Sequence, residues 1–116
     1  MVYEGGAVVK LIIGGAYQGK RQYASEHYGD ELLVLDFHLK VLAWLKEDID
    51  PVLHFKNNLS EYQDKVILCD DISCGVVPVD PLMRKWREAL GYILTLIAKE
   101  SDEVIRVLCG IGMKLK

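Results

Sequence analysis

The sequence predicts an α/β fold in which a parallel β-sheet carries helices on both faces. Two observations predict this class. Short apolar runs, rich in β-branched residues, alternate along the chain with longer segments of helical periodicity. The chain also has 116 residues, of which 51% are hydrophobic, so it is long enough and apolar enough to form one core. We therefore expect residues 1–116 to fold as a single domain.

The expected strands are the short apolar runs, which end in glycine or in polar residues. They cover Ala7–Ile13, Glu31–Asp36, Val66–Asp70 and Glu103–Cys109. In a parallel sheet the carboxyl ends of the strands lie at one edge, and ligands bind there. The segments at these ends are therefore expected to converge in space: Gly14–Lys20, Asp36–His38, Asp70–Asp71 and Gly110–Gly112.

Helices are expected between the strands, where apolar residues recur every three or four positions. They cover Lys20–Tyr28, Leu39–Lys46, Pro51–Tyr62 and Pro81–Glu100. The last two follow Asp50 and Asp80, because aspartate caps a helix and proline suits its first position. The apolar stripe of Pro81–Glu100 is broad, so it either packs on the sheet or forms the subunit interface of a homo-oligomer.

The composition bears on partners and compartment. The net charge of −3 argues against nucleic acid as the main partner, because proteins that bind its backbone carry a basic stripe. No apolar run approaches the length of about 20 residues that spans a bilayer, and the N-terminus lacks the basic start of a signal peptide. Cys69, Cys74 and Cys109 lack the spacing of a zinc or redox site, so we expect reduced thiols in a cytoplasmic protein.

The segment Gly14–Arg21 reads GGAYQGKR and has the GxxxxGK spacing of a P-loop, between an expected strand and an expected helix. Its glycines would turn backbone N–H groups inward as an anion nest at the positive end of the helix. Lys20 would add a cation for the outer phosphates. The pattern predicts a P-loop NTPase-like fold that binds phosphate or a nucleotide, and the alternative is a structural glycine turn. The nucleotide-binding residues are Gly14, Gly15, Ala16, Tyr17, Gln18, Gly19, Lys20 and Arg21.

Two features bear on Mg²⁺. Arg21 stands where a P-loop has the Ser or Thr whose hydroxyl ligates the ion. A guanidinium cannot ligate a cation, so Arg21 either binds phosphate or points into solvent, and Mg²⁺ binding is expected to be weakened. Asp70 and Asp71 follow an apolar strand, where a carboxylate holds Mg²⁺ directly or through water. The alternative is that both are solvated acids at a strand end.

Four segments together resemble a known family. Besides the loop, they are Asp70–Asp80 (DDISCGVVPVD), Trp86–Gly91 (WREALG) and Cys109–Lys116 (CGIGMKLK). Their order and spacing are similar to those of the adenosylcobinamide kinase / adenosylcobinamide-phosphate guanylyltransferase family of cobalamin assembly. That family has a Gly-Gly-Ala-Arg-Ser-Gly-Lys-Ser loop, an Asn-Glu-Val-Gly-x-Gly-Ile-Val-Pro segment, a helix with Phe-Arg-Asp-x-x-Gly and a closing Ser-Gly-x-x-x-Lys. The resemblance covers residues 7–30 and 65–116.

The resemblance implies a kinase of cobalamin biosynthesis that transfers the γ-phosphoryl group of ATP or GTP to adenosylcobinamide. Lys20 would stabilise the transferred charge. Asp71 would take the proton of the acceptor hydroxyl or, with Asp70, hold Mg²⁺. The oligomeric habit of the family also favours a homo-oligomer.

The middle of the chain is shorter than in the family, where it carries the histidine that becomes guanylylated. Without that segment the guanylyl transfer has no assigned residue. The segment Asp36–Leu45 aligns with the family in two ways, with the deletion either after or before it. His38 is accordingly either the counterpart of that histidine or a surface or core histidine at a helix start.

Two other functions stay open on the sequence. A shortened relative that carries Arg21 could be a non-catalytic module that binds nucleotide or phosphate and regulates or supports a partner. The chain could also be a kinase for another small alcohol. Mg²⁺-dependent turnover with adenosylcobinamide would distinguish the kinase implied by the resemblance from both.

Overall fold

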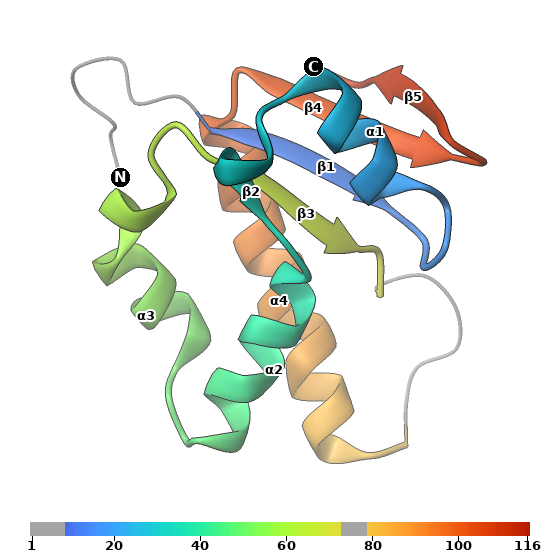
Figure 1. The fold of residues 1–116 in the computed structure, drawn as a ribbon. Coiled ribbons are helices and arrows are strands. Elements are labelled where there is room, and N and C mark those ends of the chain that lie inside the picture. Colours follow the sequence, from blue (N-terminus) through green and yellow to red (C-terminus); the bar gives the residue numbers. More distant parts are fainter. Residues whose placement is uncertain (1–8, 73–78) are drawn as a thin grey trace.

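A five-stranded sheet forms the centre of the computed structural model, which describes residues 9–72 and 79–116 (Figure 1). The strands are β1 (Lys10–Gly14), β2 (Leu33–Val34), β3 (Val66–Asp70), β4 (Glu103–Leu108) and β5 (Ile111–Lys114). Their order across the sheet is β2-β3-β1-β4-β5. Strands β2, β3, β1 and β4 are parallel to one another, and β5 pairs antiparallel with β4.

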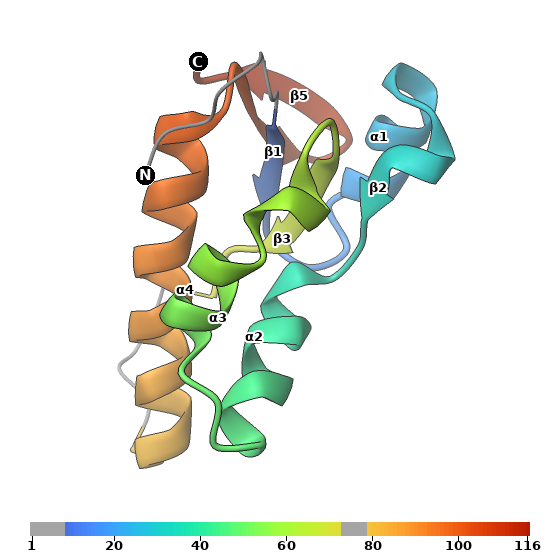
Figure 2. The same cartoon turned by 90° about the vertical axis from the view of Figure 1, so that its left-hand side faces the viewer.

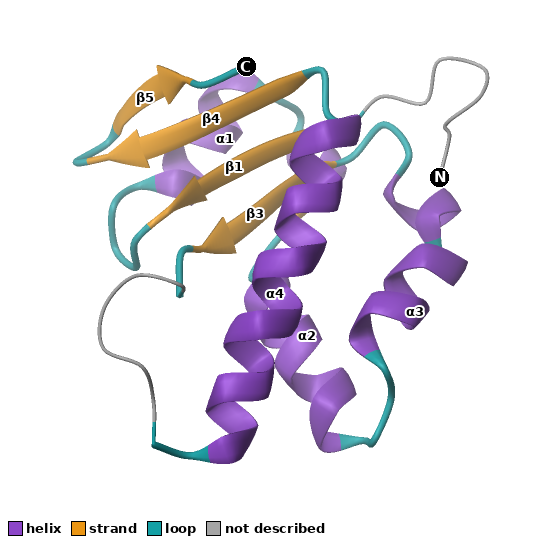
Figure 3. Ribbon diagram, turned by 180° about the vertical axis from the view of Figure 1, so that it is seen from behind, coloured by secondary structure: helices purple, strands orange, loops and turns teal. Residues whose placement is uncertain are grey.

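Helices cover both faces of the sheet, as Figures 2 and 3 show from two further sides. They are α1 (Lys20–His27), α2 (Phe37–Lys46), α3 (Pro51–Asn57) and α4 (Pro81–Glu100). Alternate strand residues face opposite layers: Ile12 and Leu68 pack with Ala24 of α1, whereas Leu11 and Ile67 pack with the other three helices. The predicted fold class, a largely parallel sheet with helices on both faces, is therefore confirmed.

The register of the central strands places the segment after β1 beside the end of β3. Gly14, the last residue of β1, is opposite Asp70, the last residue of β3. The backbone N–H of Asp71 donates to the Gly14 carbonyl at 2.9 Å, which continues the pairing by one residue. The loop that follows β1 thus begins next to Asp70, the last residue of β3, and Asp71, the residue after it.

The two predicted aspartate-proline helix starts are confirmed. The Asp50 carboxylate accepts hydrogen bonds from the N–H groups of Val52 and Leu53, and α3 begins at Pro51. Asp80 accepts from the Leu82 N–H at 2.8 Å, and α4 covers the predicted residues. Each carboxylate satisfies N–H groups that have no partner inside the helix.

Several predicted boundaries are wrong. The strand predicted at Glu31–Asp36 is only β2, because Asp30–Leu32 forms a 3₁₀ turn. The helix predicted over Pro51–Tyr62 ends at Asn57, and a 3₁₀ turn follows at Leu59–Tyr62. Asn58 ends this helix: its side-chain amide donates to the His54 carbonyl at 2.8 Å, in competition with the backbone.

The other strand and helix ends differ by a few residues. Of the strand predicted at Ala7–Ile13, β1 starts only at Lys10, and residues 7 and 8 lie outside the described residues. The helix predicted from Leu39 already begins at Phe37. Residues 73–78 of the predicted loop after β3 also lie outside the described part of the chain.

Strand β5 is a further departure, because no strand was predicted after Glu103–Cys109. Cys109 and Gly110 both have positive φ, 52° and 76°, as the two central residues of a type I′ hairpin turn require. The turn reverses the chain, so Ile111–Lys114 pairs with β4 as an antiparallel edge.

The apolar stripe of α4 packs inside the chain. Leu90, Ile93 and Ile97 are buried against the sheet and its neighbouring helices, which is one of the two roles predicted for it. A homo-oligomer stays a prediction. Within residues 9–72 and 79–116, no helix has the length and apolarity to cross a membrane.

Candidate functional site

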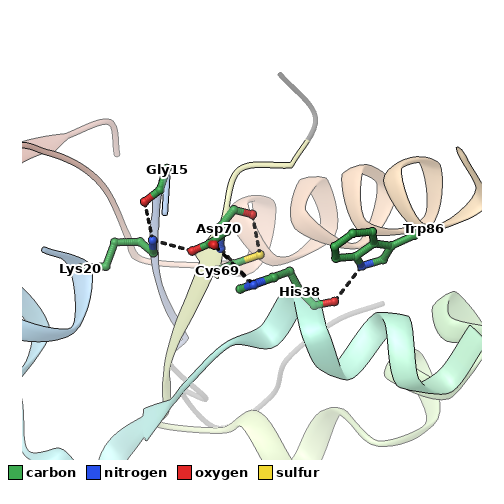
Figure 4. A network of polar contacts seen from close by, with 6 residues as sticks. All are labelled: Gly15, Lys20, His38, Cys69, Asp70 and Trp86. Carbon is green, nitrogen blue, oxygen red and sulfur yellow. Dashed lines mark hydrogen bonds and ion pairs between the residues drawn. The ribbon is translucent and has the colours of Figure 1, made fainter. Parts of the chain in front are cut away.

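Lys20 and Asp70 form the centre of the site at the carboxyl edge of the sheet. Lys20 is the first residue of α1, and its ammonium lies 2.6 Å from Oδ1 of Asp70 at the end of β3 (Figure 4). The same ammonium donates to the Gly15 carbonyl at 2.7 Å. The Lys20 side chain is only 10% exposed, so this ion pair is weakly screened by water.

His38 holds the other side of the Asp70 residue. Its Nδ1 accepts a hydrogen bond from the backbone N–H of Asp70 at 3.1 Å, and its Nε2 lies 3.5 Å from Oδ2. Because Nδ1 is an acceptor, the neutral ring carries its proton on Nε2, which faces the carboxylate. The Trp86 indole N–H donates to the His38 carbonyl at 2.7 Å and ties α4 to this point (Figure 4).

The burial of His38 bears on the two roles predicted for it. The residue is buried in the second position of α2, so it is a core histidine at a helix start. Both ring nitrogens face Asp70. Whether His38 is also the counterpart of the guanylylated histidine stays a prediction.

Cys69, the neighbour of Asp70, has a buried thiol that favours its neutral form. Burial, aided by the Asp70 charge, raises the pKa of its thiol from 9.0 to about 12. Its Sγ lies 3.3 Å from the Asp70 carbonyl. A thiol that stays protonated at neutral pH is a poor nucleophile and a poor metal ligand.

The loop before α1 is held by the turn between β4 and β5. The Gln18 carbonyl accepts from the Gly110 N–H, and the Gln18 side-chain oxygen accepts from the Cys109 N–H, both at 2.8 Å. Gly19 has φ of 89°, and a Cβ there would lie 3.1 Å from the Gly110 Cα. A glycine is required at this position, therefore, for conformation and for space.

A cleft of about 350 Å³ opens beside the loop. Its walls are residues 16–19, Lys20–Gln22, Leu35, Asp36, Leu68 and Asp70. Arg21 lines it as an exposed side chain, so the predicted departure from the P-loop pattern faces the same space as Lys20. Tyr17, also in the wall, is fully exposed and has φ of 60°.

The predicted convergence of the strand ends is therefore found. Lys20 meets Asp70, His38 meets Asp70, and Gln18 meets Cys109 and Gly110. Asp71, predicted as catalytic, contributes its backbone to Gly14, whereas the ion pair of Lys20 is with Asp70.

Four wall residues lie outside the predicted site, Gln22, Leu35, Asp36 and Leu68, and Asp36 is the acidic one. It follows β2 and lines the cleft with Lys20 and Arg21. A signal for it existed, because Asp36 belongs to a segment that was expected at the carboxyl edge. No motif surrounds Asp36 in the sequence, so the sequence alone predicts no specific role for it.

The donor set allows a test for Mg²⁺. No group of three or more His, Cys, Asp and Glu side chains able to hold a metal ion occurs within the described ranges. Asp70 offers a carboxylate beside the loop, and position 21 offers no hydroxyl. Such a set fits an ion that takes most of its ligands from phosphate and water, which is the habit of Mg²⁺ with nucleotides.

Comparison with known proteins identifies the family. The family model described as cobinamide kinase / cobinamide phosphate guanyltransferase matches residues 34–115. The chain belongs to this family. A stretch of 51 residues is 35% identical to the bifunctional adenosylcobalamin biosynthesis protein CobU of Salmonella typhimurium (strain LT2). That stretch covers 44% of this chain and 28% of the Salmonella protein.

The extent of the family match matters for the site. It includes Asp36, His38 and Asp70, together with α4 and the whole β4–β5 hairpin. The loop Gly14–Arg21 precedes residue 34 and lies outside the match. The case for this loop therefore rests on its spacing and on its contacts with Asp70 and the β4–β5 turn.

Proposed function

We propose that this member of the cobinamide kinase family binds ATP or GTP at the loop Gly14–Arg21 and transfers its γ-phosphoryl group to adenosylcobinamide. One observation carries the proposal. The Lys20 ammonium lies at the N-terminus of α1, 2.6 Å from the carboxylate that ends the neighbouring parallel strand. A helix N-terminus with a cation attracts phosphate, and a carboxylate beside it suits a phosphate-bound Mg²⁺.

Each residue has a defined task in this proposal. Backbone groups of the loop hold the phosphates, and the Lys20 ammonium stabilises the charge that builds on the transferred group. Asp70, with Asp71 next to it, holds Mg²⁺ directly or through water. His38 keeps the Asp70 carboxylate in place. Bound Mg²⁺ would neutralise phosphate charge. Phosphoryl transfer depends on positioning and electrostatics more than on covalent chemistry.

A second function has its own supporting observation. The two Asp70 carboxylate oxygens face Lys20 and His38, and Arg21 replaces the hydroxyl that P-loops supply to Mg²⁺. A site with this set binds phosphate through cations and depends little on the metal. The alternative is therefore a non-catalytic module that binds nucleotide or phosphate within the same family.

The first prediction tests the binding site through Lys20. Lys20→Ala removes the cation aimed at the phosphates, and a charge-assisted contact contributes about 1.5–3 kcal/mol. Calorimetric titration with ATP and GTP should therefore show affinity reduced about tenfold to a hundredfold. Lys20→Met keeps the bulk of the stem and should behave alike, whereas Lys46→Ala, an exposed lysine at the end of α2, should bind as wild type.

The outcome separates the two functions. Equal affinities in wild type and Lys20→Ala would remove the nucleotide site altogether. If binding depends on Lys20, the wild type is mixed with nucleotide, Mg²⁺ and adenosylcobinamide, and the phosphorylated product is measured by mass spectrometry. Product formation supports the kinase, and tight binding without product supports the non-catalytic module.

A further inference from the structure

Within the described residues, three helices follow an aspartate, and Asp36 differs from the other two aspartates. Asp50 and Asp80 have extended backbones, with φ of −69° and −65°, and their carboxylates cap α3 and α4. Asp36 precedes α2 with φ of 52° and ψ of 48°, in the left-handed region, and its side chain makes no cap hydrogen bond. The Asp36 carboxylate is thus not used to start its helix.

The left-handed backbone of Asp36 needs an explanation. Asp48 and Asp64 also have positive φ, but Asp48 follows the end of α2 and Asp64 lies in the turn before β3, where such conformations are common. At the start of a helix an extended residue is the rule. Strained positions of this kind gather at functional sites, because surrounding packing must hold them.

The packing that holds Asp36 is visible in the next residue. Phe37 is completely buried, and its ring makes edge-to-face contacts with Trp44, Phe55 and Tyr62. These contacts anchor the start of α2. Asp36, the residue before Phe37, lines the cleft.

Two carboxylates, those of Asp36 and Asp70, are among the described wall residues of the cleft. Only the Asp36 carboxylate has no hydrogen bond or ion pair with another described residue. Asp70 faces Lys20 and His38. Asp36 is exposed. Leu35 and Leu68 add apolar surface to the same wall. This is the composition expected where an alcohol with an apolar body is held beside Lys20.

We propose that Asp36 binds the hydroxyl group of the acceptor and takes its proton during phosphoryl transfer. This inference rests on the proposed function. The acceptor oxygen forms a bond to the γ-phosphorus, and the bond from that phosphorus to the β–γ bridging oxygen breaks, which releases the nucleoside diphosphate. The hydroxyl proton passes to the Asp36 carboxylate and from there to solvent, which this exposed side chain contacts.

The role replaces the one that the sequence suggested for Asp71. Asp36 is a wall residue of the cleft, on the opposite side from the β4–β5 turn that holds the loop. In the proposed function Asp70 holds Mg²⁺ next to the phosphates, so the acceptor needs a different carboxylate. The arrangement divides the work between two strand ends: the end of β3 serves the nucleotide, and the end of β2 serves the acceptor.

The test uses Asp36→Asn, because asparagine has the same size and also adopts the left-handed conformation but cannot take a proton. The matched control is Asp48→Asn, the same change at a left-handed aspartate outside the cleft. For adenosylcobinamide, kcat should fall about 10²- to 10⁴-fold in Asp36→Asn, the usual share of a general base. Nucleotide affinity and melting temperature should stay at wild-type values, and Asp48→Asn should behave as wild type throughout.

A second variant separates catalysis from folding. Asp36→Gly relieves the left-handed strain, so it should melt at or above the wild-type temperature while its kcat falls as in Asp36→Asn. Wild-type kcat in Asp36→Asn overturns the inference and leaves the proposed kinase intact. Loss of nucleotide binding in Asp36→Asn, or an equal loss of kcat in Asp48→Asn, overturns it as well, because the effect is then general.

If the wild type transfers no phosphate, the proposed kinase activity fails. A binding measurement then tests whether Asp36 contacts the acceptor hydroxyl. Equilibrium dialysis would measure adenosylcobinamide bound in the presence of a non-hydrolysable ATP analogue. Binding by wild type that is weakened about tenfold or more in Asp36→Ala supports Asp36 as the hydroxyl contact. No binding by wild type, or equal binding by both proteins, overturns the inference.

Discussion

Arg21 lies in the first turn of α1 and is the residue at which the loop departs from the P-loop pattern. That turn contains Lys20 and Arg21 and no acidic residue. Because the N-terminus of a helix carries partial positive charge, cations there are unfavourable. Asp70 offsets the charge of Lys20, whereas Arg21 is exposed and makes no ion pair with the described residues. A bound phosphate would offset the charge of Arg21 in the same way.

The exposed Arg21 side chain bears on the metal dependence of nucleotide binding. Because Arg21 stands where a P-loop has its metal ligand, wild-type affinity for ATP or GTP should depend on Mg²⁺ less than in an intact P-loop, and a change below about threefold would favour the non-catalytic module. Arg21→Ser restores the hydroxyl and should raise the Mg²⁺ effect to about tenfold or more. Titration calorimetry with and without Mg²⁺ measures both values.

Arg21→Lys is the matched control, because it keeps the charge and adds no hydroxyl. The change in nucleotide affinity on adding Mg²⁺ should be the same in Arg21→Lys as in wild type. Strong Mg²⁺ dependence already in wild type, unchanged in Arg21→Ser, would mean that Arg21 is a solvated helix residue and that the metal has another ligand.

At the scale of elements, the site depends on how closely β1 and β4 approach at its edge. A Cβ on Gly14 would lie 2.5 Å from the Val107 carbonyl oxygen, which is a backbone atom and cannot move aside. A Cβ on Gly15 would meet only the Gln18 side chain, at 3.6 Å. The two adjacent glycines of the loop therefore differ: Gly14 is required for packing, and Gly15 is not.

Gly14→Ala should accordingly destabilise the protein by about 1–3 kcal/mol, the usual cost of forcing an extra methyl group into a packed position. Gly15→Ala should stay within about 0.5 kcal/mol of wild type. Urea unfolding followed by circular dichroism gives both free energies. Equal stability of the two variants would show that the end of β1 adjusts freely, and the close approach of β1 to β4 would lose its importance.

At the scale of the whole molecule, the sheet separates two apolar layers, and the site lies at the edge between them. The layer under α2, α3 and α4 contains Cys69, which is completely buried next to Asp70. Cys109, in the β4–β5 turn, is exposed. Alkylation of Cys69 therefore reports whether the core has opened, and alkylation of Cys109 reports the accessible surface.

Native protein treated with iodoacetamide should be alkylated at Cys109 and protected at Cys69, as read by peptide mass spectrometry. Burial raises the Cys69 pKa from 9.0 to about 12, so the folded state favours the neutral thiol. The associated stability is fully present below pH 9.0 and is lost as pH rises toward about 12. Protection should therefore hold at pH 8 and fail with unfolding in alkali. Rapid Cys69 labelling at pH 8 would contradict the closed core.

Local sequence signals were sufficient for much of the fold. Proline after Asp50 and Asp80 located two helix starts, and the β-branched run at Val66 located the whole of β3. Local signals failed where a side-chain contact or an unusual backbone conformation determined where an element ends or begins. The end of α3 depends on a side chain that binds the His54 carbonyl, and β5 depends on two left-handed residues, one of them the non-glycine Cys109.

By itself, the sequence determined the fold class, the loop and the set of strand ends that form the site, because these follow from periodicity, glycine and the geometry of parallel sheets. Only the tertiary structure decided which residues meet there. It paired Lys20 with Asp70, buried His38 behind that carboxylate, and placed Asp36 in the cleft. The physical reason is that adjacent residues at a strand end point in different directions, so the choice between two neighbouring aspartates depends on the strand packed beside them.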